Sequence, residues 1–262
     1  MKNTIIFQEG QGQQDDRKYL LPSNGPGTIS FKADGTPNFR PISAGFTAFD
    51  VLPSTTAAAG ANQLLVSLGT STEVIARSAT GGVNVKSQAS TPADDDNAML
   101  IPVAGNAMFA PITAVARPRF RTLVKLTQIN QLQFGAGLDE NITTPIGSAT
   151  TGDGAQFIFD PENELTLGAA TKWIAAQKIA GADTYVNTGV TVVAGKYYEL
   201  EIALGADKIP LYYINGALVA TGAAALTGTS PIGAVIGLQC SGTPDTQKDF
   251  DCVYVAVERF IG

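Results

Sequence analysis

The sequence predicts an all-β fold, a sandwich or barrel built from short antiparallel strands. Three observations support this prediction: apolar and polar residues alternate along many short segments, Gly and Pro recur between nearly all of them, and no segment shows a convincing 3.6-residue period. Alternation with a period of two is typical of strands that bury one face, because successive side chains point to opposite sides. Short strands without intervening helices favour a sandwich or barrel over alternating strands and helices.

The clearest strands lie between residues 196 and 220. From Tyr198 to Leu204, apolar residues alternate with Glu199 and Glu201, and a second apolar run ends at Asn215-Gly216. Asn-Gly accepts the positive φ angles of a type I′ turn, so the chain is expected to form a hairpin there. Further strands are predicted at 64–68, 73–77, 83–86, 99–103, 120–126, 132–134, 156–159, 173–177, 185–191, 235–240 and 250–260.

The last predicted strand is apolar on both faces. Val253, Val255 and Val257 fall on one side of the alternation, whereas Cys252 and Tyr254 fall on the other. A strand of this kind is expected near the middle of a sheet, with its second face covered by loops or by another subunit.

Residues 1–45 differ from the rest and are predicted to form an N-terminal arm, followed by the β domain at residues 46–262. Short apolar groups alternate there with polar, Gln-rich sequence, and one short strand is expected near residues 28–32. Such a segment could be a frayed terminus or an arm that becomes ordered on a neighbouring subunit. In the second case, its contacts would be made by Ile5, Ile6, Phe7, Tyr19, Leu20 and Leu21.

Composition excludes several classes of function. The net charge of −6 argues against a nucleic-acid or anionic-membrane partner. The absence of histidine excludes Ser-His-Asp and Cys-His catalysis and removes the commonest transition-metal ligand. No apolar run reaches the length of a membrane helix, and the first residues turn polar too soon for a signal peptide. Cys240 and Cys252 are therefore expected to be free, buried thiols.

A series of short motifs in the C-terminal part resembles the concanavalin A-like jelly-roll superfamily. In order, these motifs occupy residues 156–160, 172–173, 183–190, 195–202, 212–216 and 249–255. Residues 212–216 are similar to the superfamily's aromatic-x-Ile-Asn-Gly hairpin, and 249–255 to its closing strand. The resemblance implies an antiparallel jelly-roll β-sandwich, with residues 46–150 supplying the remaining strands.

The superfamily includes lectins, laminin G-like modules and many bacteriophage virion proteins, so its fold does not decide function. Only 15% of the residues are charged and no signal peptide is found, so the chain looks most like the phage proteins. That resemblance implies a non-enzymatic capsid decoration (cement) protein without a cofactor. Its partner would be the major capsid protein or another virion protein, and it would be a homo-oligomer, with a trimer favoured. It would be made in the host cytoplasm and would lie on the capsid surface.

The alternative is a carbohydrate-binding, receptor-recognising module of a tail fibre or a similar surface appendage. Sugar binding in β-sandwiches uses exposed aromatic residues, and Tyr212 and Tyr213 are expected to point to opposite faces, which leaves one of them exposed. Trp173, at a strand start, is expected in the core. A third reading is glycan hydrolysis, but the sequence lacks the Glu-x-Asp-x-x-Glu motif of the superfamily's hydrolases.

Charged residues form three further groups to consider as candidate sites. Asp94, Asp96 and Asn97 could offer oxygen ligands to calcium, although a solvated acidic turn explains them as well. Glu199 and Glu201 share one strand face, which we expect to be a solvated surface rather than a catalytic pair. Arg119 and Arg121 also share a face and could meet an acidic partner subunit or solvent.

Overall fold

The structure is a computed structural model of the chain. It describes the backbone of residues 3–6, 18–21, 27–31, 37–41, 46–48, 64–68, 74–78, 82–87, 93–94, 96–102, 116–140, 152–163, 171–227, 232–242 and 246–261. Side chains are described for residues 78, 82–87, 93–94, 96–100, 118–140, 152–163, 171–227, 232–242 and 246–256. These residues contain strands and turns and no helix, so none of them belongs to a helix that could cross a membrane.

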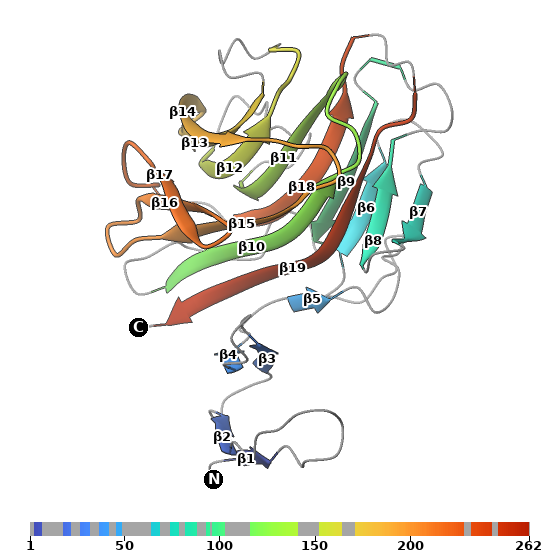
Figure 1. The fold of residues 1–262 in the computed structure, drawn as a ribbon. Helices are drawn as coiled ribbons and strands as arrows, with labels where there is room; N and C mark the ends of the chain where they lie inside the picture. Colours follow the sequence, from blue (N-terminus) through green and yellow to red (C-terminus); the bar gives the residue numbers. More distant parts are fainter. Residues whose placement is uncertain are drawn as a thin grey trace. The chain divides into compact units, whose positions relative to one another are not determined.

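Two antiparallel sheets make up the sandwich (Figure 1). Sheet I runs in the order β17 (Ala217–Thr221), β16 (Pro210–Ile214), β15 (Tyr197–Leu204), β10 (Ala116–Leu126), β19 (Asp249–Ile261), β8 (Val83–Lys86) and β7 (Val74–Arg77), and β5 (Phe46–Ala48) also pairs with β19. Sheet II runs in the order β14 (Ala182–Thr191), β13 (Lys172–Ile179), β12 (Gly154–Phe159), β11 (Leu132–Asp139), β18 (Gly233–Cys240), β9 (Asn97–Pro102) and β6 (Leu64–Leu68). The all-β sandwich predicted from the alternation is therefore confirmed.

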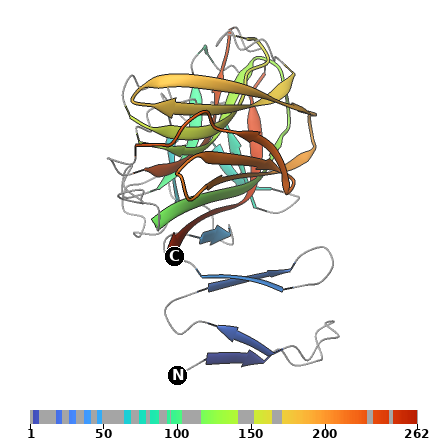
Figure 2. The same ribbon diagram turned by 90° about the vertical axis from the view of Figure 1, so that its left-hand side faces the viewer.

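The N-terminal residues contain two further pairs of strands. β1 (Asn3–Ile6) pairs with β2 (Lys18–Leu21), and β3 (Gly27–Phe31) pairs with β4 (Pro37–Pro41). The chain divides into two compact units, Met1–Ala44 and Gly45–Gly262. Each hairpin appears as a separate ribbon in Figure 2.

A cluster of aromatic rings fills the space between the sheets. Trp173 of β13 is fully buried and lies edge-on to Phe134 (5.9 Å between ring centroids) and to Tyr198 of sheet I (5.6 Å). Phe157 contacts Tyr212 at 5.4 Å, which joins the sheets at a second point. Each ring takes roughly 150–250 Å² of surface out of water, so these residues contribute much of the stability of the sandwich. The prediction that Trp173 belongs to the core is confirmed.

The last strand, β19, is a central strand as expected, but its faces differ from the prediction. Val124 of β10 pairs with Cys252 and Leu123 pairs with Tyr254, so the register shifts at Val253. This β-bulge adds one residue and reverses the alternation beyond it. Cys252 and Val255 are both buried as a result, whereas Tyr254 lies on the outer face of sheet I.

Candidate functional site

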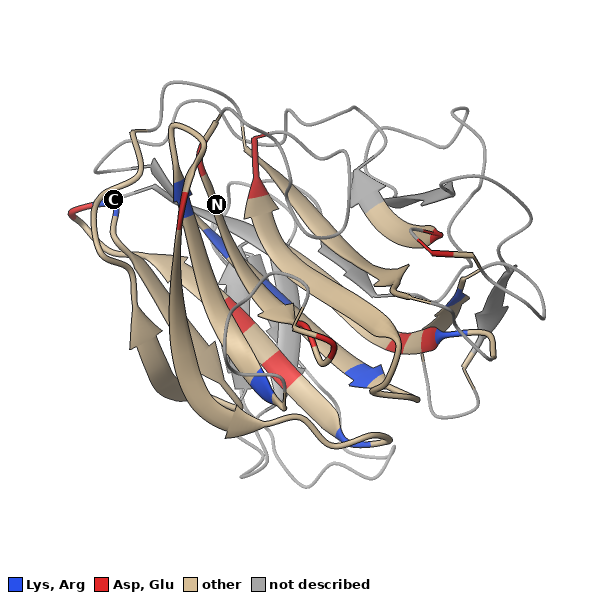
Figure 3. Cartoon of the chain, turned by 90° about the horizontal axis from the view of Figure 1, so that it is seen from above, with Lys and Arg blue, Asp and Glu red and all other residues tan. Residues whose placement is uncertain are grey.

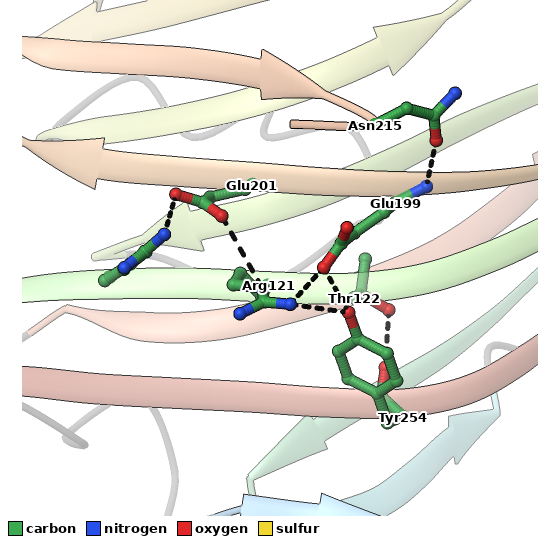
Figure 4. A network of polar contacts seen from close by, with 7 residues as sticks. Arg121, Thr122, Glu199, Glu201, Asn215 and Tyr254 are labelled. Atoms are coloured by element: carbon green, nitrogen blue, oxygen red, sulfur yellow. Dashed lines mark hydrogen bonds and ion pairs between the residues drawn. The ribbon is translucent and has the colours of Figure 1, made fainter. Parts of the chain in front are cut away.

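The outer face of sheet I carries a ladder of cross-strand ion pairs. Arg119 and Arg121 of β10 lie opposite Ala203 and Glu201 of β15 in the register, with Glu199 two residues along the same strand. Arg119 binds Glu201, Arg121 binds Glu199, and Arg121 Nε lies 3.5 Å from Glu201 Oε2. Figure 4 shows the guanidinium group of Arg121 joined by dashed lines to Glu199 and Glu201.

Tyr254 extends this ladder onto β19. Its hydroxyl donates to Glu199 Oε1 at 2.7 Å and accepts a hydrogen bond from Arg121 at 3.3 Å. Burial opposes the charge of Arg121, but Tyr254 and Glu199 outweigh it and raise the pKa of this guanidinium. The two glutamates are therefore neutralised by basic groups of the same chain. The expected solvated face is wrong for Glu201, which is 9% exposed.

A second set of polar contacts continues across sheet I to β8. Lys125 Nζ lies 2.6 Å from Asp251 Oδ2, and Asn84 donates to both Asp249 and Asp251 at 2.9 and 2.8 Å. Burial acts to raise the pKa of Asp251, but hydrogen bonds from Lys125, Asn84 and Ser78 lower it overall. Figure 3 shows the resulting pattern of blue and red segments on neighbouring strands. These contacts join β8, β10 and β19 across the outer face of sheet I.

The outer face of sheet II carries a buried ion pair at one end of its strands. Lys178 Nζ lies 3.0 Å from Asp139 Oδ1 and 2.8 Å from Oδ2, and Gln156 Nε2 lies 3.5 Å from Oδ2. All three side chains are less than 5% exposed. The register places Gly154 between Asp139 and Lys178, where a Cβ atom would lie 2.9 Å from the carboxylate. The glycine thus leaves room for the pair.

The neighbouring strand β14 adds exposed side chains to the same face. Asp183, Tyr185 and Asn187 lie opposite Lys178, Ala176 and Ile174 of β13, so all three point to the outer side of sheet II. Tyr185 is 39% exposed. Partial burial, followed by the charge and hydrogen bond of Asp183, raises the pKa of Tyr185 to about 12. We call the group formed by Asp139, Gln156, Lys178, Asp183, Tyr185 and Asn187 the sheet II site.

This arrangement combines the groups that bind polyhydroxylated ligands. An aromatic ring can pack on the apolar face of a sugar, while carboxylate, amide and ammonium groups bind its hydroxyls. Ala176, which is buried, lies between Tyr185 and Gln156 in the register. The sheet II site therefore has an exposed aromatic residue at its rim and fixed polar groups beside it.

The tyrosines predicted as sugar platforms lie elsewhere. Tyr212 is 1% exposed, and its hydroxyl donates to the carbonyl oxygen of Ala176 at 2.6 Å. It is a core residue that spans the two sheets, so its prediction as a sugar platform is wrong. Tyr213 points to the outer face of sheet I and is partly exposed. The structure does not bring it together with the sheet II site.

The candidate calcium ligands bind backbone groups. Asp96 accepts a hydrogen bond from the Ala93 N–H at 2.7 Å, and Asp94 accepts one from the Gly242 N–H at 2.9 Å. Asn97 Oδ1 is buried and lacks a hydrogen-bond partner among the residues described here. Within the described ranges, no group of three or more Cys, Asp or Glu residues could hold a metal ion.

The predicted contact residues of the N-terminal arm fall where no side chain is described. In the backbone of β1 and β2, Ile5 pairs with Tyr19, whereas Leu20 and Leu21 pair with Thr4 and Asn3. Ile6 pairs with Lys18, and Phe7 lies outside the described residues.

The prediction of free, buried cysteines is confirmed for Cys240 and Cys252. Burial raises the pKa of Cys252 to about 12, and Thr122 Oγ1 lies 3.4 Å from its sulfur. A thiol held in its neutral form this strongly is a poor nucleophile, so Cys252 acts as a core residue.

The sequence analysis did not single out Tyr185 or its neighbours as a site. A signal was present, since Asp183, Tyr185 and Asn187 alternate in one strand and therefore share a face. However, Asp139 and Lys178 are 39 residues apart, and only the register of β11, β12 and β13 brings them together.

Comparison with known proteins shows the fold. No family model and no curated protein matches the chain. The catalytic domain of an endo-1,3-β-glucanase (laminarinase) from Thermotoga petrophila superimposes with a TM-score of 0.55 at 11% identity, covering 89% of this chain and 98% of its own. A β-glucanase from Bacillus licheniformis gives 0.51 at 13% identity over 84% and 99%, and a Shewanella oneidensis protein of unknown function gives 0.54 at 12% over 82% and 85%. The fold is a concanavalin A-like jelly-roll β-sandwich.

Two predictions change with this comparison. The prediction that the protein is not an enzyme is contradicted, because two of the similar solved structures are glucanases. The resemblance to phage decoration proteins also gains no support from these structures, although the jelly-roll fold that it implied is confirmed. At 11–13% identity, the likeness extends to the fold and not to the residues of an active site.

Proposed function

We propose that this protein binds carbohydrate at the sheet II site. The observation that carries the proposal is the exposed ring of Tyr185, flanked on the same face by Asp183 and Asn187 and adjoining the buried Asp139–Lys178 pair. The carbohydrate-binding alternative predicted from the sequence is thus kept, while its contact residues move from Tyr212 and Tyr213 to β14.

The fold supports this ligand class. The two superimposed enzymes with defined activities are named as glucanases. A jelly-roll sandwich with an exposed aromatic on one sheet face can take the same general class of ligand without sharing their residues. We therefore propose a glycan of several linked sugars, because the site extends across neighbouring strands from β11 to β14.

Each group in the site has a distinct part in binding. Tyr185 would pack against the C–H face of a pyranose ring and contribute apolar contact. Asp183 would accept hydrogen bonds from vicinal hydroxyls, and the amides of Asn187 and Gln156 would donate or accept. Lys178 and Asp139 are buried and bind each other, so this pair would fix the strands that carry the ligand-binding groups.

Glycan cleavage is a second candidate, favoured by the two glucanases among the similar structures. Hydrolysis of this class needs two carboxylates on either side of the scissile bond. Asp139 belongs to the sheet II site, and Glu140 follows it with Oε1 buried and lacking a hydrogen-bond partner in the described part of the chain. Adjacent strand residues point to opposite sides, so cleavage would require these two groups to be brought around one ligand.

The test is a glycan array followed by titration calorimetry with the best soluble glycan. Tyr185→Ala is expected to weaken binding by about tenfold, roughly 1.4 kcal/mol, through loss of the ring contact. Tyr213→Ala, on the outer face of sheet I, is the matched control and should leave the affinity unchanged. An equal loss in both variants, or none in Tyr185→Ala, would count against the site.

The same samples test cleavage. Incubation of the wild-type protein with β-1,3-glucan and mixed-linkage glucan should be followed by reducing-end release. Turnover that disappears in Asp139→Asn and Glu140→Gln would establish hydrolysis, whereas binding without turnover would leave recognition as the function.

An attachment role for Met1–Ala44 remains a proposal alongside glycan binding. It is supported by the division of the chain into two compact units. In this proposal, the N-terminal unit binds the assembly that carries the protein, including a virion as the sequence suggested, while the sandwich binds the glycan. Deleting residues 1–44 should abolish attachment and preserve glycan affinity.

A further inference from the structure

Strand β14 presents an unusually exposed sheet edge. It is the outermost strand of sheet II in the described backbone, and residues 182–187 are all exposed. One side of the strand pairs with β13. A free edge offers a row of backbone N–H and C=O groups that can pair with another strand.

The strand lacks the features that usually protect an edge. β14 contains neither Lys nor Pro, and Asp183 is its single charged residue. Natural edges are commonly blunted by Lys, Pro or a β-bulge. The one irregularity in its pairing with β13 lies beyond Asn187, near Gly189, whose φ is +77°. Residues 182–187 therefore form a regular, nearly uncharged edge.

Exposed apolar side chains lie on this strand and on segments next to it. Within the part of the chain whose side chains are described, the large hydrophobic residues with the greatest exposure are Tyr185 (39%), Val186 (37%), Val193 (48%) and Leu218 (54%). The first two belong to β14, Val193 lies two residues beyond its end, and Leu218 belongs to β17, which contacts β14. Exposed apolar side chains such as Tyr185 and Val186 on an edge strand favour an interaction surface.

We propose that β14 pairs with β14 of a second copy of this chain, joining two sheets II edge to edge about a two-fold axis. The identical strand is a suitable partner because an antiparallel edge is complementary to itself: outward N–H and C=O groups of one copy meet those of the other. Each copy carries a net charge of −6, so two copies repel each other. A surface with little charge, such as this edge, is therefore a suitable place for them to meet.

Symmetry restricts the register of this pairing. A two-fold axis perpendicular to the sheet keeps each side chain on its own face, so opposed residues must share a face and the central residue must meet its own copy. Centring on Asp183 would place two carboxylates opposite each other, which is unfavourable. Centring on Tyr185 pairs the two tyrosines and uses the regular part of the strand. In this register, Asp183 lies opposite Asn187 of the other copy, and Thr184 lies opposite Val186.

The first test is the oligomeric state by sedimentation velocity between about 1 and 100 µM, the range in which a small interface of this kind is expected to associate. The wild-type chain should form a dimer. Val186→Lys places a charge beside the two-fold axis and should weaken the dimer by at least about tenfold. Asn130→Lys adds the same charge at an exposed turn and should leave the dimer intact.

Cysteine cross-linking tests the register. Both native cysteines are buried, so an introduced thiol is the reactive one. Under mild oxidation, Tyr185→Cys should form a disulfide-linked dimer faster than Thr184→Cys, Val186→Cys or the exposed control Leu218→Cys. Circular dichroism of each variant confirms that the sandwich is folded.

The proposal is overturned by a wild-type chain that stays monomeric over the whole range, or by a dimer that survives Val186→Lys. Cross-linking that is equally fast at all four positions would indicate random collision and also overturns it. Because glycan binding is measured separately with the Tyr185→Ala variant, failure of the edge pairing leaves the proposed function standing.

Discussion

At the scale of single residues, the ion pairs on the two outer faces differ in burial and therefore in consequence. Arg119 and Arg121 are 24% and 16% exposed and share two glutamates, so the loss of one contact on sheet I can be compensated by solvent or by a neighbour. Lys178 and Asp139 are 4% and 3% exposed and form an ion pair with each other. Removing one partner of a buried pair leaves an uncompensated charge in a medium of low dielectric constant.

Lys178→Met is accordingly expected to lower the free energy of unfolding by about 3–5 kcal/mol. The double variant Lys178→Met, Asp139→Leu removes both charges and should recover much of this loss. Chemical denaturation at pH 7 measures both values, with Lys125→Met as the control at the more exposed pair on sheet I. A loss below about 1 kcal/mol in Lys178→Met would show that the pair behaves like a surface contact.

At the scale of elements, the register of β11, β12 and β13 places the groups of the sheet II site. This register brings some backbones so close together that only glycine, which has no Cβ atom, fits between them. A Cβ atom at Gly137 would lie 2.2 Å from the carbonyl oxygen of Ala155 on β12, a distance that no side chain can occupy without moving a strand. Gly216, in the Asn-Gly hairpin, has a φ of +80° but open space around it.

The two glycines should therefore respond differently to substitution. Gly216→Ala is expected to cost about 1 kcal/mol, because alanine resists a positive φ. Gly137→Ala should cost about 2–3 kcal/mol or more, because β11 and β12 must separate, and it should also weaken glycan binding by displacing Asp139. Thermal unfolding and calorimetry of both variants test this, and equal costs would contradict the argument from close approach.

At the scale of the whole molecule, the sandwich has its own core and its own cross-strand network. The aromatic cluster joins the two sheets with residues drawn entirely from Gly45–Gly262. Neither the cluster nor the ion pairs described for sheets I and II use a residue of Met1–Ala44.

A chain lacking residues 1–44 is expected to keep its far-UV circular dichroism signature of β-structure. Its melting temperature should lie within about 4 °C of the full-length value, equivalent to less than about 1–2 kcal/mol for a domain of this size. A collapse of the cooperative transition would show instead that the N-terminal unit is part of the folding domain.

The sequence determined the fold class, because period-two alternation, Gly and Pro spacing and the Asn215-Gly216 turn are local properties of the chain. Most predicted strands appear within a few residues of their expected bounds, and burial of Trp173, Cys240 and Cys252 followed from residue type. The faces of β19 escaped prediction because a bulge at Val253 depends on the partner strand. The burial of Tyr212 and the exposure of Tyr185 escaped prediction for a similar reason: exposure depends on which strand ends a sheet, and strand order is set by pairings between distant residues. The sheet II site likewise exists only in the tertiary structure, where Asp139 and Lys178 meet across β12.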